Sequence, residues 1–268
     1  MSGYIGAGST SHLVNKMYVG ISGQAKAVQK AYIGVAGKAK LWYQLGSPLS
    51  NYNVGNTVKF KVNNVSYDWI IVHKGKPSGD YDMPNDSIIL MMNILYAWDN
   101  MLTTSGGTCY SYNESQIHNT YLNGTFLNWI EPTIRNSIIQ VKIPYYNNGS
   151  GKVLSGSSGL SAKVFIPSAS EIDAVQHNDP EGVKWSYFQT DAGNRRIAYW
   201  QGNRESWWTR SRRLWWIDHK YSFTTVRYDG GYEASDASPG NGNKHGIRPC
   251  IVVPSSILVD DKGYIIGA

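Results

Sequence analysis

Residues 195–220 read RRIAYWQGNRESWWTRSRRLWWIDHK and hold five of the ten tryptophans of the chain, together with seven Arg and Lys residues. This is far more Trp than a core needs in so short a stretch, and Trp and Arg are the side chains most enriched at the energetic centres of binding surfaces. We expect Trp207 and Trp208 to belong to the core. The run from Arg212 to Tyr221 mixes charged, polar and aromatic residues without a period. The stretch therefore predicts a buried segment that leads into a displayed binding surface.

The composition indicates a globular protein rich in strands and loops. Only 16% of the 268 residues are charged, and there are 28 Gly and 19 Tyr. Arg and aromatic rings also bind single-stranded nucleic acid, but no nucleic-acid-binding motif accompanies the net charge of +6, so we expect no nucleic-acid partner. No apolar run approaches the length of a membrane span, so we expect no membrane insertion.

The first residues and the cysteines indicate where the chain is made. MSGYIGAGST lacks the basic region and apolar core of a signal peptide, so we expect synthesis in a cytoplasm. Only Cys109 and Cys250 are present, which does not indicate a disulfide framework.

A short repeat occupies the first 44 residues. Tyr4-Ile5-Gly6, Tyr18-Val19-Gly20 and Tyr32-Ile33-Gly34 recur at a spacing of 14 residues. Each unit reads as a short strand, a Gly turn and a second strand, and three units predict a small β-meander. Such a meander is thin, and association with other copies would supply its missing core. We therefore predict that residues 1–46 form an assembly module, with a flexible tail as the alternative.

The rest of the chain shows short strands and few helices. The pattern predicts strands at 57–62, 67–72, 88–92, 163–166 and 247–253, and a closing hairpin from 257–259 and 263–266. Capping boxes Ser111-x-x-Glu114 and Ser168-x-x-Glu171 each predict a helix, and Pro132 begins another helix within 131–139. The Gly- and Ser-rich residues 145–161 predict an exposed loop.

The order of these motifs resembles a bacterial and phage family with a C-type-lectin-like fold, whose members include the variable proteins of diversity-generating retroelements. The N-terminal repeat likewise resembles repeats at the N-termini of phage tail and virion proteins. The first resemblance covers residues 47–268 and is most specific at Trp207-Trp208-Thr209-Arg210-Ser211 and Gly246-Ile247-Arg248-Pro249. It implies an α+β chain with a C-type-lectin-like (formylglycine-generating-enzyme-like) ligand-binding domain at 47–268, of short antiparallel strands and a few helices, after the small β-repeat module. Family members usually have Pro where this chain has Arg212.

The resemblance also divides the residues of this region into two sets. In such proteins a reverse transcriptase copies a template with errors at adenines, and the product rewrites a C-terminal coding segment, here about 206–250. The residues implied as fixed scaffold are Trp207, Trp208, Arg210, Ser211, Gly246, Arg248 and Pro249. The residues implied as variable ligand-binding positions are Arg212, Arg213, Leu214, Trp215, Trp216, Asp218, His219, Tyr221, Phe223, Tyr228, Asp229, Tyr232 and Asp236.

The residues and the resemblance together indicate a phage or prophage receptor-binding protein. Tyr and Trp supply large contact area at low conformational cost, as binding loops require. We expect a bacterial cell-surface receptor, either protein or glycan, as the ligand. We expect residues 1–46 to attach to other phage tail proteins and to join copies of the chain, as a trimer. The protein is then located in the virion, in the phage tail, after synthesis in the host cytoplasm.

Three alternatives stay open. The first is an enzyme, since formylglycine-generating enzymes use the same fold with paired cysteines or metal-binding histidines. Here Cys250 lies in an expected core strand and the histidines are scattered singly, so we expect no catalytic residue, cofactor or metal. The second is a calcium-dependent lectin, but Glu131-Pro132-Thr133 departs from the family's Ca²⁺ loop and no Trp-Asn-Asp triplet is present. The third is a fixed adhesin or a structural virion component.

Overall fold

The computed structural model describes residues 3–7, 10–14, 18–21, 24–28, 30–35, 38–44, 46–101, 109–174, 180–213, 222–236 and 243–267. Short β-strands dominate these residues, and the helices among them are few and short. The fold is therefore mixed α+β, as the sequence predicts.

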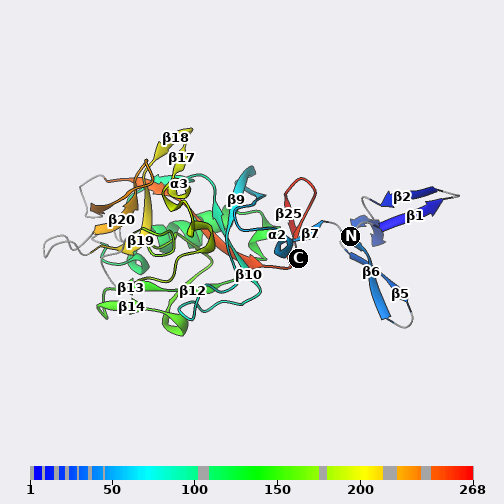
Figure 1. Ribbon diagram of the computed structural model, residues 1–268, viewed down its shortest axis with the longest axis horizontal. Helices are drawn as coiled ribbons and strands as arrows, with labels where there is room; N and C mark the ends of the chain where they lie inside the picture. The colour runs from blue at the N-terminus through cyan, green and yellow to red at the C-terminus, as the bar shows by residue number, and fades with distance from the viewer. Residues whose placement is uncertain are drawn as a thin grey trace.

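The N-terminal repeat forms one β-hairpin per unit. The hairpins pair β1 (Gly3–Ala7) with β2 (Thr10–Val14), β3 (Tyr18–Ile21) with β4 (Gln24–Ala27), and β5 (Lys30–Val35) with β6 (Lys38–Gln44). The predicted strand-turn-strand unit is confirmed, but the predicted meander is wrong. Each hairpin is a separate two-stranded sheet, and no strand pairing joins one hairpin to the next within the described part of the chain. Figure 1 shows the hairpins in blue at one end of the molecule.

The first five-stranded sheet holds much of the core, in the order β16-β23-β10-β9-β8. The predicted hairpin of β8 (Thr57–Val62) and β9 (Val65–Lys74) is confirmed, with alternate residues of β8 buried. Asn63 and Asn64 both have positive φ, as a two-residue turn that matches the strand twist requires. Next to β9 runs β10 (Ser87–Met92), in which all six residues are buried. The sheet ends with β23 (Cys250–Pro254) and β16 (Val164–Phe165).

A second five-stranded sheet has the order β11-β22-β19-β20-β21. Its central strand β19 (Trp207–Arg212) pairs antiparallel with β20 (Ser222–Val226) and parallel with β22 (His245–Ile247). β11 (Ala97–Asp99) and β21 (Tyr232–Asp236) form the two edges. Every residue of β19 and β20 is buried, so the centre of this sheet lies inside the protein, whereas Glu233 and Ala234 of the edge strand β21 are exposed.

Smaller sheets complete the strand structure. They pair β12 (Val141–Ile143) with β15 (Leu160–Ala162), β13 (Tyr145–Asn147) with β14 (Lys152–Leu154), and β17 (Ala198–Trp200) with β18 (Asn203–Glu205). The predicted loop at 145–161 is therefore wrong. Gly149, Ser150 and Gly151 lie in the turn of the β13–β14 hairpin, whose first residue Tyr145 is buried, and Gly156–Ser158 form a short 3₁₀ helix.

The start and the end of the region after the repeat lie in one small sheet. β24 (Leu258–Val259) pairs with β25 (Ile265–Gly267), which confirms the predicted closing hairpin, and also with β7 (Ser47–Pro48). Gly46 has a φ of +79°, and a Cβ there would lie 2.3 Å from the carbonyl oxygen of Val259. Glycine is therefore required where the chain leaves the hairpins and joins this sheet.

The predicted helix after Ser111 is present as η3 (Ile117–Phe126), and the helix at Pro132 is shorter than the predicted range 131–139. The described helices are η1 (Leu49–Asn51), η2 (Tyr112–Glu114), the π-helix η3 (Ile117–Phe126), α1 (Leu127–Trp129), α2 (Pro132–Arg135), η4 (Gly156–Ser158), η5 (Ser186–Phe188) and α3 (Ala192–Arg196). The helix after Pro132 ends at Arg135, and a single 3₁₀ turn lies between Ser111 and η3.

The helix predicted at Ser168 is wrong for a specific reason. The reciprocal capping bonds do form, since the Ser168 N–H donates to Glu171 Oε2 at 2.8 Å and the Glu171 N–H donates to Ser168 Oγ at 3.2 Å. However, Asp173 adopts a left-handed φ of +61°, which an α-helix does not allow. The box therefore stabilises a turn.

Candidate functional site

Two tryptophans begin the buried segment of β19. Trp207 Nε1 donates to the carbonyl oxygen of Arg196 at 2.9 Å, and Trp208 Nε1 donates to that of Asp99 at 2.8 Å. Both side chains are fully buried, so each indole needs and has a hydrogen-bond acceptor. These bonds fix β19 to two segments that lie before it in the sequence.

Arg210 lies at the centre of a buried polar network. Its guanidinium makes a two-pronged contact with Glu171, with Nη1–Oε2 at 2.7 Å and Nη2–Oε1 at 2.6 Å. The remaining donors reach backbone carbonyls: Nε to Pro144 at 2.9 Å, Nη1 to Ile166 at 2.9 Å and Nη2 to Glu181 at 3.3 Å. Both side chains of the ion pair have no exposed surface. A buried charge pair is tolerated only when its geometry and hydrogen bonds are this complete.

A second buried carboxyl group, Glu181, lies beside the pair. Its Oε2 is 3.9 Å from Arg210 Nε and accepts a hydrogen bond from Ser211 Oγ at 3.2 Å. Burial raises the pKa of Glu181 to about 8, although Arg210, the Ser211 hydroxyl and the Tyr146 backbone each act to lower it. Burial therefore favours the uncharged form of Glu181, and the two-pronged contact makes Glu171 the ion-pair partner of Arg210.

Arg248, directly after β22, is a second buried arginine that donates to backbone carbonyl oxygens. Its Nε donates to the carbonyl oxygen of Met92 at 3.0 Å, and its guanidinium lies 5.4 Å from the ring centroid of Trp207. Burial lowers the pKa of Arg248 to about 10, so it stays a cation at neutral pH. Nearby, a Cβ on Gly246 would lie 2.3 Å from Leu95 Cδ1. All seven residues that the resemblance implies as scaffold are buried.

Arg212, the last residue of β19, and Arg213, directly after it, are buried and do not lie on the surface. Arg212 and Arg213 are each only 6% exposed. The Arg212 guanidinium lies 4.8 Å from the ring centroid of Tyr146, and its Nη1 donates to Asn148 Oδ1 at 3.3 Å. Burial lowers the pKa of Arg213. The expectation that both side chains lie open on the binding surface is wrong, because the β13–β14 hairpin, which the sequence did not predict, contacts the first of them.

Phe223 is also a core residue. It is fully buried in β20, with its ring edge-on to Trp208 at 6.4 Å between centroids. The prediction that Phe223 belongs to a displayed surface is therefore wrong. It alternated with polar neighbours in the sequence, but β20 is buried along its whole length.

The turn between β20 and β21 carries the exposed part of the predicted surface. Tyr228 is 58% exposed. Asp229 is exposed as well, pairs with Arg227 Nη2 at 2.9 Å and accepts a hydrogen bond from the Gly231 N–H, which orders the turn. Tyr232 is half-buried, with the Arg196 guanidinium 5.9 Å from its ring centroid.

The other predicted positions are not described in atomic detail. Asp236 is the last residue of β21, and only its backbone belongs to the described structure. Six more predicted positions lie outside the described residues: Leu214, Trp215, Trp216, Asp218, His219 and Tyr221. They fall between β19 and β20, directly after Arg213.

The residues that sequence reasoning missed are the acidic partners of the network. The sequence predicts Glu171 only as a helix cap and does not indicate a site role for Glu181 or Tyr81. Tyr81 Oη donates to Glu171 Oε1 at 2.5 Å. Nothing in their local sequence marks these residues. Glu171 and Glu181 lie 39 and 29 positions before Arg210, and Tyr81 lies 90 positions before Glu171. In the sequence, Arg210 of the WWxRS motif indicates that a buried carboxylate partner exists, but not where it lies.

The thiols and possible metal ligands are dispersed. Cys109 and Cys250 are both buried and free. Burial raises the pKa of Cys109 to about 12 and that of Cys250 well above its ordinary value, so both are neutral thiols at neutral pH. The described residues contain no group of three or more His, Cys, Asp and Glu side chains able to hold a metal ion. Among the same residues, no helix has the length and apolar character that crossing a membrane requires.

Removing the central cation should destabilise the fold strongly. In Arg210→Met, Glu171 would stay buried without its ion-pair partner, so we expect a loss of about 3–5 kcal/mol in the free energy of unfolding, measured by chemical denaturation. The matched control is Arg227→Met, which removes an exposed pair and should cost at most about 1 kcal/mol. Equal losses in the two variants would contradict the role given to Arg210.

The buried carboxyl group should make stability depend on pH. Because the pKa of Glu181 is raised from 4.5 to about 8 on folding, the folded state holds a proton that the unfolded state releases. The free energy of unfolding should therefore fall by about 1–2 kcal/mol as the pH rises from about 6.5 to 8.

The control for this pH effect is Glu181→Gln, in which the decline should disappear. His118 and His245 have pKa values lowered by burial to about 4, so their effect has the opposite sign and lies below their ordinary pKa of 6.5. An identical decline in the wild type and in Glu181→Gln would assign it to another group.

Comparison with known protein families relates this core to one family. A family model described as a domain of unknown function (DUF6273) matches residues 85–255, from just before β10 to just after β23. The match includes Glu171, Arg210 and Arg248. No curated protein and no solved structure matches the chain. Because the matched residues make up more than half of the 268, the chain belongs to the DUF6273 family.

Proposed function

We propose that this protein is a phage or prophage receptor-binding protein that displays a diversified binding surface on a C-type-lectin-like scaffold. The observation that carries the proposal is the contrast within the second sheet. Its strands β19 and β20 are buried, and the hydrogen bonds of Arg210 hold β19 in place. In contrast, the β20–β21 turn places Tyr228 and Asp229 in solvent. A rigid framework with exposed aromatic and polar residues on its loops is the usual geometry of a recognition site.

The revised surface is smaller than the sequence predicts. It consists of Tyr228, Asp229 and Tyr232, together with the predicted positions between 214 and 221. Arg212, Arg213 and Phe223 become part of its support. The proposed ligand is a protein or glycan on a bacterial cell surface, since Tyr side chains contact both without needing a metal ion.

The N-terminal hairpins are proposed to attach and to oligomerise the chain. Tyr18, Val19 and Tyr32 are exposed on hairpins that have two strands each, and two strands alone do not bury an apolar face. Contact with copies of the same hairpins, and with other tail proteins, would cover these side chains. A trimer places three binding surfaces on one particle, and such multivalency multiplies weak affinities.

Removing the exposed Tyr228 ring and the half-buried Tyr232 ring should weaken binding to cells. The full-length chain, labelled with a fluorophore, is tested by flow cytometry on a panel of bacterial strains that includes the organism carrying the gene. We expect the double variant Tyr228→Ala, Tyr232→Ala to lower binding at least about tenfold, because exposed tyrosines often dominate such surfaces. Tyr199→Ala is the control, since this tyrosine is also exposed but lies outside 206–250.

Two outcomes would contradict this part of the proposal. Either no strain binds the chain, or the double variant binds as well as Tyr199→Ala. Sequencing the gene from a population separates a diversified surface from a fixed adhesin. Diversification predicts substitutions at 214–221 and at Tyr228, Asp229 and Tyr232, beside a constant Phe223. It also predicts a reverse-transcriptase gene nearby.

The hairpins should determine the mass of the particle in solution. We expect the full-length chain to have three times the mass of the 29.8 kDa monomer by light scattering. Deleting residues 1–44 should give a monomer, because the exposed side chains of the hairpins are then absent. A full-length monomer, or a trimer that survives the deletion, would exclude this role for the hairpins.

A further inference from the structure

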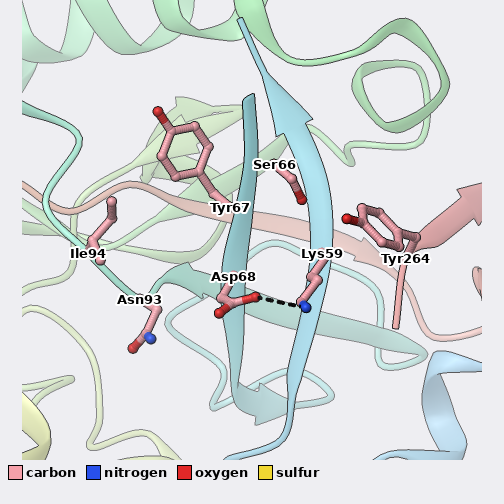
Figure 2. Close-up of a pocket in the computed structure, with 7 residues that line it drawn as sticks. All are labelled: Lys59, Ser66, Tyr67, Asp68, Asn93, Ile94 and Tyr264. Carbon is pink, nitrogen blue, oxygen red and sulfur yellow. Dashed lines mark ion pairs between the residues drawn. The ribbon is translucent and has the colours of Figure 1, made fainter. Parts of the chain in front are cut away.

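A surface cavity of about 410 Å³ lies on the β8–β9 hairpin, away from the surface proposed above. Figure 2 shows its lining residues: Lys59 from β8, Ser66 and Asp68 from β9, and Tyr264 from the segment that leads into β25. The volume is within the range of about 300–1,000 Å³ that is usual for small-molecule sites.

The floor of the cavity is an ion pair with spare hydrogen-bonding capacity. Lys59 and Asp68 face each other across the two strands, with Nζ and Oδ1 3.9 Å apart. This distance is too long for a hydrogen bond. In the part of the chain that the structure describes, neither side chain makes another polar contact that would occupy it, apart from the Tyr264 ring 6.0 Å from Lys59 Nζ. A donor and an acceptor therefore lie side by side, open to a ligand.

The walls are held in place by backbone hydrogen bonds. The Asn93 N–H donates to the carbonyl oxygen of Asp68 at 2.9 Å, which places Asn93 on one side of the ion pair. On the other side, the Lys59 N–H donates to the carbonyl oxygen of Gly263 at 2.8 Å, and the Tyr264 N–H donates to Asp260 Oδ1 at 2.8 Å. In Figure 2, Asn93 and Tyr264 lie on opposite sides of the Lys59–Asp68 pair. The cavity is thus built by three segments whose relative positions are fixed.

Tyr264 supplies an aromatic ring beside the ion pair, with its centroid 6.0 Å from Lys59 Nζ. Tyr67 also lines the cavity, but successive side chains of a strand point to opposite faces, and Tyr67 pairs with the buried Phe60. The Tyr67 ring therefore packs toward the core, where it makes an edge-on contact with Tyr96 at 5.4 Å between ring centroids.

We propose that this cavity binds a neutral saccharide through one or two pyranose rings. Adjacent hydroxyl groups of a pyranose each donate and accept, so one pair of them bridges Lys59 and Asp68, and the apolar C–H face of the ring packs on Tyr264. The two charges of the floor cancel, which favours a neutral ligand over a phosphate or a carboxylate. The site lies outside residues 206–250, so it is independent of the diversified surface and would hold the same class of sugar in every variant.

The proposal is tested by saturation-transfer NMR on the full-length chain. The probes are the methyl glycosides of glucose, mannose and galactose, together with N-acetylglucosamine and N-acetylgalactosamine. We expect at least one to bind with a Kd on the order of 1 mM, as is usual for a single weak site. Lys59→Met and Asp68→Ala should each weaken its binding at least tenfold, and Tyr264→Leu should weaken it as well.

The control variants remove the same kinds of charge at positions that do not line the cavity. Lys61→Met lies two residues along the same strand, and Asp86→Ala changes an exposed carboxylate elsewhere; neither lines the cavity, and both should bind like the wild type. Lys59 and Asp68 are about half exposed, so their variants should keep the wild-type thermal unfolding midpoint.

Three results would overturn the proposal. They are the absence of saturation transfer to every probe, equal binding by the Lys59 and Asp68 variants and the wild type, and displacement of the saccharide by inorganic phosphate at a lower concentration than the sugar itself requires. These results leave the cell-binding test of Tyr228 and Tyr232 unaffected, so failure here is distinguishable from failure of the proposed function.

Discussion

The contact between Arg210 and Glu171 is the charged centre of a network that joins distant parts of the chain. Removing both charges from water is costly, and the cost is offset only while every donor of the guanidinium has an acceptor. Those acceptors come from Glu171 itself and from the backbone at Pro144, Ile166 and Glu181. The first sheet, the second sheet and the segment before β13 must therefore keep their relative positions, or a buried charge loses its partner. The requirement adds to the burial of Trp207 and Trp208 in keeping β19 inside the protein.

Local periodicity predicted the elements that depend on local interactions. The alternation at 57–62, the uninterrupted apolar run at 88–92 and the final hairpin all match the structure, since each is determined by which face of a strand meets the core. The helix expected after Ser168 is absent although its capping bonds with Glu171 form, because Asp173 turns the chain with a left-handed φ. Distant contacts such as that between Arg210 and Glu171 leave no trace in a window of ten residues.

The candidate surface shows the same limit. Arg212 and Phe223 look like surface residues in the sequence, because charged or polar neighbours surround them. The burial of Arg212 follows from the β13–β14 hairpin, which is distant in the sequence, and that of Phe223 from its contact with Trp208 on the neighbouring strand. Tyr228 and Asp229 were predictable, since a turn marked by two glycines separates two strands there. Sequence reasoning therefore located the exposed turn correctly, but could not separate displayed side chains from the ones that support them.

The pairing of β7 with β24 has a consequence for how the chain is built up. It brings Ser47–Pro48 beside Leu258–Val259, so the chain from η1 to β23 begins and ends at one small sheet. Figure 1 shows this sheet on the side that faces the N-terminal hairpins. A change in the length of a loop between η1 and β23 therefore need not move the paired strands β7 and β24, where this region joins the preceding chain. The region after residue 46 is therefore portable: it can follow a different N-terminal module without rearrangement, because its connection to the preceding chain is a single strand at its edge.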